Sequence, residues 1–208
     1  AYTHINGAFS FNSKDTIVIN KVIELENVHF EHQKKEQERE EGQGLPHLIF
    51  EKDVYIYDTT SLLFYNCTFK GDLEIDTSVL GNDQINELDQ KHPNYEPDIG
   101  FYNCTFHKNV ALDIGSIENY SSISFNIFYS KFISKTERLE NEIFTNSIRE
   151  THIDENLFEG NGYLDLSVDN SLFTSIYGNN FGDYRVHFSK ESFNKTSVLY
   201  LRRSLTFK

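Results

Sequence analysis

The hexapeptide Phe64–Phe69, FYNCTF, returns letter for letter as Phe101–Phe106. An identical six-residue segment repeated within 208 residues suggests an array of structural repeats. Other, less similar segments of the chain also end in Phe after polar or small residues. We expect one stacked column formed by Phe30, Phe69, Phe106, Phe132, Phe158 and Phe181.

The spacing of this Phe series predicts one repeat unit with insertions. The last four members lie 26, 26 and 23 residues apart, whereas the two earlier gaps are 39 and 37 residues. Each long gap contains a run unlike the rest, at about 31–47 and about 80–98. Removing these runs shortens the two gaps to about 22 and about 18 residues, close to the length of the others.

The local pattern within each unit predicts short β-strands. Apolar residues alternate over three to five positions, as in Val54–Ile56 and Leu73–Ile75, and Asp, Asn, Gly or Ser interrupts them. Asn66 and Asn103 are expected to be bend residues, because Asn tolerates the left-handed backbone region. A bend there would let Phe64, Cys67 and Phe69 all point inward.

Short strands, Asn at bends and turns of about 22 to 26 residues resemble the pectin-lyase-like right-handed parallel β-helices. The resemblance implies an all-β single domain over residues 1–208, but it identifies no active site. Triplets such as Cys67–Phe69 and Val186–Phe188 are also similar to atypical pentapeptide-repeat proteins. Those proteins keep a strict five-residue period, which this chain does not, so the irregular β-helix is preferred.

Three segments are expected to depart from the strand pattern. The run at about 31–47 is highly charged and predicts a solvated helix or a loop, with a docking arm as the functional alternative. The run at about 80–98 contains two of the three prolines and predicts a loop, in which acidic groups, His92 and Tyr95 resemble a ligand site. The segment at about 135–148 predicts a short amphipathic helix from the spacing of Leu139, Ile143 and Phe144.

The composition limits the functions of the chain. A net charge of −13 argues against direct nucleic-acid binding and leaves open a basic partner, divalent cations or solubility alone. No apolar run is long enough to span a bilayer. The chain contains no Met, which predicts a processed form or part of a longer chain. Four glycosylation sequons, at Asn66, Asn103, Asn119 and Asn194, favour a secreted or cell-surface protein.

Two cysteines, Cys67 and Cys104, occupy the same place in the two hexapeptides. They are interpreted as buried free thiols, and a disulfide is the alternative if their strands are neighbours, because paired strands lie about 4.8 Å apart.

No catalytic, cofactor-binding or metal-ligating residues are predicted from motif spacing. His152 and Asp154 would share one face of a strand, and Asp165 is expected near them one turn on. Acids expected to alternate outward are interpreted as solvated surface; they are Asp72, Glu74, Asp76, Asp113, Asp165 and Asp169.

The sequence therefore favours a non-catalytic β-helical module that presents loops and surfaces to protein partners. It could also stack on further copies of itself, because no helix is predicted to cover the end strands. The alternatives are an enzyme acting on polysaccharide, with carbohydrate as its ligand, and an acidic mimic of nucleic acid.

Overall fold

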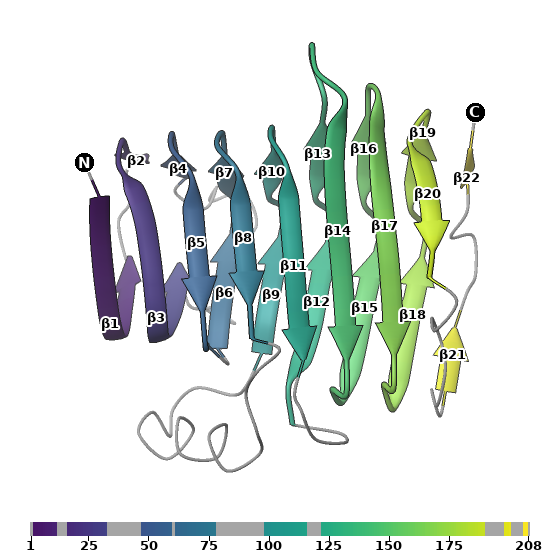
Figure 1. Cartoon of the computed structure of the whole chain (residues 1–208), viewed down its shortest axis with the longest axis horizontal. Coiled ribbons are helices and arrows are strands. Elements are labelled where there is room, and N and C mark those ends of the chain that lie inside the picture. Colours follow the sequence, from purple (N-terminus) through teal and green to yellow (C-terminus); the bar gives the residue numbers. More distant parts are fainter. Residues whose placement is uncertain are drawn as a thin grey trace, which may run out of the picture.

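The computed structural model describes residues 2–11, 16–32, 47–59, 61–77, 98–115, 122–189, 198–200 and 206–207. All regular structure in these residues is β-strand, and every pairing between strands is parallel. Figure 1 shows that the strands follow one another from β1 at one end of the molecule to β22 at the other.

The strands form three layers, because beyond β3 each strand pairs with the strand three places further along the chain. Layer A contains β5 (Val54–Tyr57), β8 (Leu73–Asp76), β11 (Val110–Gly115), β14 (Leu139–Asn146), β17 (Gly162–Asp169) and β20 (Arg185–Phe188). Layer B contains β6 (Ser61–Tyr65), β9 (Asp98–Tyr102), β12 (Ser124–Phe128), β15 (Glu150–Asp154), β18 (Phe173–Tyr177) and β21 (Val198–Tyr200). Layer C contains β2 (Ile17–Ile19), β4 (Leu48–Phe50), β7 (Cys67–Phe69), β10 (Thr105–Phe106), β13 (Lys131–Ile133), β16 (Leu157–Glu159), β19 (Asn180–Gly182) and β22 (Thr206–Phe207).

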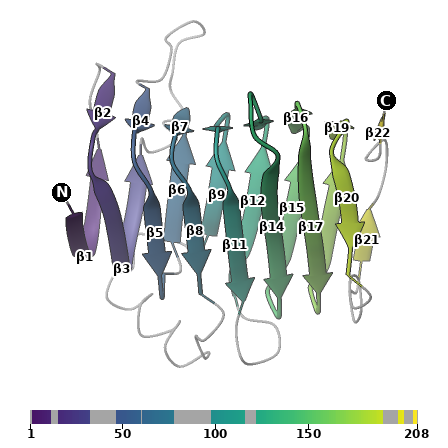
Figure 2. The same ribbon diagram turned by 45° about the horizontal axis from the view of Figure 1, so that its top comes forward.

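Two long strands join layers A and B. The first part of β3 (Val22–His32) pairs with β5 and its last part pairs with β6, while β1 (Tyr2–Phe11) pairs along β3. The short strands of layer C run along one edge of the two longer layers (Figures 1 and 2). The chain passes through layers C, A and B in turn and then begins again.

The two hexapeptides lie beside each other in register. Phe64 pairs with Phe101, and Phe69 pairs with Phe106. Asn66 and Asn103 have φ angles of 53° and 54°, which confirms their prediction as bend residues in the left-handed region. The predicted inward position of Phe64, Cys67 and Phe69 is confirmed as well, since all three are buried.

Phenylalanines of layer C form a stacked column through the interior. From Phe69 onward the predicted members are correct, and Phe106, Phe132 and Phe158 stack at centroid distances of 4.7 and 4.5 Å. Phe181 continues the column at 4.9 Å from Phe158. Each ring is buried against the next, so the column excludes water from β7 to β19.

The prediction that Phe30 begins this column is wrong. Phe30 belongs to β3 and pairs with Leu62, so it lies on layer B. The place next to Phe69 belongs to Phe50, whose ring stacks on it at 5.0 Å. Residues 47–59 thus contain two strands, β4 and β5, that the comparison of Phe30 with Phe69 does not take into account.

The expected helix at 135–148 is also wrong, because β14 occupies Leu139–Asn146 and pairs with β11 and β17. Leu139, Ile143 and two polar residues, Asn141 and Thr145, are buried and alternate with more exposed positions. The Asn141 side chain accepts a hydrogen bond from the amide of Val110 at 3.0 Å. Burial alternates with a period of two along β14, but two of its buried positions carry polar residues, so the sequence does not show an alternation of apolar and polar residues.

The other two expected insertions lie mostly outside the described residues. Of the run at 31–47, Glu31 and His32 belong to β3 and His47 precedes β4, and of the run at 80–98, Asp98 begins β9. Residues 33–46 and 80–97, including His92 and Tyr95, are not among the described residues.

Phe106→Ala should lower the free energy of unfolding by about 3 to 5 kcal/mol, because it leaves a cavity between two stacked rings. Urea denaturation checks this, with Tyr129→Ala as the control, since Tyr129 is 65% exposed. A loss for Phe106→Ala no greater than that for Tyr129→Ala would show that the column does not carry the fold.

Candidate functional site

One cluster of ionisable groups lies on the outer side of layer B, around His152 in β15. Glu150 Oε2 is 3.4 Å from His152 Nε2, and Asp154 Oδ2 is 3.8 Å from His152 Nδ1. The imidazole lies between the rings of Phe128 and Phe173, with centroids at 6.0 and 5.2 Å. The predicted sharing of one strand face by His152 and Asp154 is therefore confirmed.

Opposing influences set the protonation of this cluster. Burial of the ring is the largest influence on the pKa of His152 and lowers it, because a charged imidazolium loses hydration. Interactions with Asp154 and Glu150 together outweigh burial, so the pKa of His152 is raised above its ordinary value. Ser175 Oγ donates a hydrogen bond to Asp154 Oδ1 at 2.9 Å, so both carboxylates are already bonded within the protein.

Asp165 does not join this cluster, contrary to the sequence prediction. It lies on β17 in layer A, and its Oδ1 is 3.1 Å from His187 Nδ1. The expectation failed because one turn of the chain returns to the same layer, whereas Asp165 comes only part of a turn after His152.

A row of aromatic rings crosses layer B beside His152. Tyr65 and Tyr102 stack at 4.7 Å with an angle of 11° between ring planes, and Phe128 follows at 5.6 Å. Burial raises the pKa of Tyr102, and the charge of Asp98 adds to the shift. Since the rings cover one another's faces, they present edges to solvent rather than a flat platform for stacking a sugar.

The outer side of layer A is acidic. Glu142 pairs in register with Asp165, and Asp76 pairs in register with Asp113. Burial raises the pKa of Asp58, with further contributions from Glu26 and Asp76. Negatively charged side chains therefore lie next to one another on neighbouring strands of layer A.

The acids predicted to face outward have two roles. Glu74 is exposed and Asp76, Asp113, Asp165 and Asp169 are half-buried, all on strands of layer A. Asp72 instead lies before β8 and accepts a hydrogen bond from the amide of Asn109 at 3.1 Å. It stabilises the corner between layers C and A.

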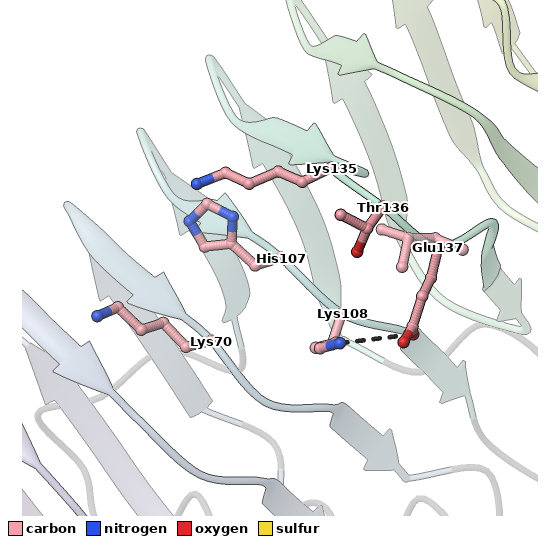
Figure 3. A pocket seen from close by; sticks show the side chains of 7 residues that line it. Lys70, His107, Lys108, Lys135, Thr136 and Glu137 are labelled. Atoms are coloured by element: carbon pink, nitrogen blue, oxygen red, sulfur yellow. Dashed lines mark hydrogen bonds and ion pairs between the residues drawn. The ribbon is translucent and has the colours of Figure 1, made fainter.

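Basic residues gather at this same corner, although the sequence shows no basic cluster. Lys70, His107, Lys108 and Lys135 line a cavity of about 270 Å³ together with Thr136, Glu137 and Leu139 (Figure 3). They are distant in sequence, so only the register of β7, β10 and β13 reveals that they meet.

Within the described ranges, no group of three or more His, Cys, Asp or Glu side chains is placed to hold a metal ion. None of the described segments is a helix that could cross a membrane. Cys67 and Cys104 are free thiols and both are buried.

The raised pKa of His152 predicts pH-dependent stability. The folded state binds this proton more tightly than the unfolded state, so the stabilisation is fully present below the ordinary pKa of about 6.5. It should be lost as pH rises through the raised pKa of His152.

An NMR titration of the His152 ring checks the shift. Asp154→Asn should lower the pKa of His152, whereas Glu159→Gln, an exposed acid on layer C, should leave it unchanged. Equal values in wild type and Asp154→Asn would contradict this account of the cluster.

Comparison with known proteins gave no match: no family model matches the chain, and neither the curated proteins nor the solved structures include a significant relative.

Proposed function

We propose that the chain is a right-handed parallel β-helix that acts as a non-catalytic interaction module, and that the acidic outer side of layer A docks a basic protein surface. The regular parallel pairing of each strand with the third strand beyond it supports a helical coil. Crossover connections between parallel strands are almost always right-handed, which supports the handedness.

The observation that carries the docking surface is the alignment of carboxylates across layer A. In register, Glu24 pairs with Tyr55, Tyr55 with Glu74, Glu74 with Ala111, and Ala111 with Glu142. Paired strands lie about 4.8 Å apart, so each glutamate of this row stands about 10 Å from the next one. The row is rigid because every strand that carries it is paired on both sides.

The electrostatic environment fits a basic partner. The pKa of Tyr57 is raised, first by burial and then by the charges of Glu74 and Glu24, so this surface disfavours additional negative charge. A concentrated negative field increases the association rate of a positively charged protein and fixes its orientation. An acidic mimic of nucleic acid would be a special case in which the basic partner is a DNA-binding protein.

A polysaccharide-active enzyme is less well supported by the geometry. Glycoside hydrolysis needs two carboxylates that flank one scissile bond. Glu150 and Asp154 flank the His152 ring instead, and Asp154 also bonds Ser175. Among the residues that line the described cavity, Glu137 is the one carboxylate.

Binding to poly-L-lysine of defined length tests the docking surface. Glu24, Glu74 and Glu142 are replaced together by Gln, and the control replaces Glu155, Glu159 and Asp183, which lie outside layer A, by Gln, Gln and Asn. Both variants lose three negative charges, so net charge alone cannot distinguish them.

Calorimetry at low salt should show about tenfold weaker binding for the layer A variant and about twofold or less for the control. The layer A variant should remain folded, because neutralisation relieves repulsion among like charges. Equal weakening in both variants would contradict a localised docking surface.

A further inference from the structure

The basic cavity at the corner between layers C and A has the composition of an anion site. Lys70 follows β7, His107 and Lys108 follow β10, and Lys135 follows β13, so three successive turns of the chain contribute to it. Figure 3 shows Lys70, His107 and Lys135 side by side, with Lys108 and Glu137 joined by an ion pair further along. Such a concentration of cations is unexpected in a chain of net charge −13.

The backbone holds these residues at fixed spacing. The amide of Lys70 donates to the carbonyl of Phe50 at 2.9 Å, and the amide of His107 donates to the carbonyl of Phe69 at 3.0 Å. The cavity is therefore built on the same register that aligns the buried Phe column, and its Cα positions are set by the core.

Internal ion pairs neutralise the cavity only in part. Lys70 Nζ lies 2.9 Å from Glu51 Oε1, and Lys108 Nζ lies 3.5 Å from Glu137 Oε2. Lys135 has no ion pair with any carboxylate of the described residues. With His107 neutral, three lysines face two carboxylates, which leaves one positive charge.

The protonation of His107 is affected by the lysines around it. Burial lowers the pKa of His107, and the positive charges of Lys135 and Lys70 lower it further. An anion placed among these three side chains would offset both lysine charges and favour protonation of the imidazole, so a proton would be taken up on binding.

We propose that this cavity binds a tetrahedral oxyanion, either a free phosphate or sulfate ion or the ester group of a larger molecule. Lysine ammonium groups bind such oxyanions as point charges, and the Thr136 hydroxyl adds a hydrogen-bond donor. Leu139 is buried at the cavity wall and provides an apolar contact for an organic substituent. A volume of about 270 Å³ exceeds the needs of a bare ion, which favours an ester.

The site is independent of the proposed docking on layer A, because it attracts charge of the opposite sign. Binding of sulfate, whose charge is the same at pH 6 and pH 8, should strengthen as pH falls through the titration of His107. The positive charges of Lys70 and Lys135 oppose the protonation of His107. Two carboxylates lie close to these lysines: Glu51 pairs with Lys70, and Glu137 pairs with Lys108.

Calorimetry of the whole chain with inorganic phosphate, inorganic sulfate, glucose 6-phosphate and acetate at pH 6 and pH 8 tests the proposal. Phosphate and sulfate should bind, and acetate should bind at least fivefold more weakly than sulfate, because sulfate carries two charges and four acceptor oxygens at both pH values. Tighter binding of glucose 6-phosphate than of phosphate assigns the site to an ester, and equal binding assigns it to the free ion; both support the site.

Lys135→Gln should weaken phosphate binding about fivefold, whereas Lys131→Gln, an exposed lysine on β13 outside the cavity, should change it less than twofold. His107→Gln should remove the dependence of sulfate binding on pH, because sulfate keeps the same charge at pH 6 and pH 8. Equal losses in the two lysine variants, no binding of phosphate or sulfate by the wild type, or binding of acetate as tight as sulfate would overturn the proposal.

Discussion

The structure depends on hydrogen bonding between strands that occupy equivalent places in successive turns. β10 contains only two residues and could not form alone, but β7 and β13 hold it on both sides. Once this pairing is in register, identical side chains must stack, so Phe106 meets a phenylalanine above and below. The aromatic core, the acidic row of layer A and the basic cavity all follow from that one alignment.

The corner between layers B and C shows how the alignment tolerates changes in sequence. Cys104, Ser130, Asn156 and Asn179 occupy equivalent places there. The Ser130 hydroxyl accepts a hydrogen bond from the backbone amide of Cys104 at 3.1 Å. In the same way, Asn156 Oδ1 accepts from the amide of Ser130, and Asn179 Oδ1 accepts from the amide of Asn156, both at 3.0 Å. Side chains thus satisfy buried amides that the bend removes from the sheet. Cys67 and Cys104 occupy the same buried place in the two earlier turns, and their thiols donate to the carbonyls of Tyr65 and Phe64.

The sequence predicted the parts of the fold that depend on local pattern and missed those that depend on register. The sequence predicts the bends at Asn66 and Asn103, because the conformation of Asn is a local property. It also predicts the column from Phe69 to Phe181, because the spacing of Phe can be read directly along the chain. The strand β14 is not recognised from the sequence because the buried polar residues Asn141 and Thr145 interrupt its apolar alternation, and the partner of Asn141, the amide of Val110, lies in the neighbouring turn. The basic cavity was missed for the same reason, since Lys70, His107 and Lys135 meet only after the turns are aligned. The resemblance to pectin-lyase-like β-helices stays a prediction.

Amide–amide nuclear Overhauser contacts in the deuterated protein test the central claim most directly. Parallel in-register stacking predicts contacts between the amide regions of Thr105 and Lys131, of Lys131 and Leu157, and of Leu157 and Asn180, progressing in the same direction along each strand. The same experiment should connect Ala111 to Glu142 and Glu142 to Asp165 in layer A. Contacts that progress in opposite directions along neighbouring strands, or that join these strands in another register, would contradict the account.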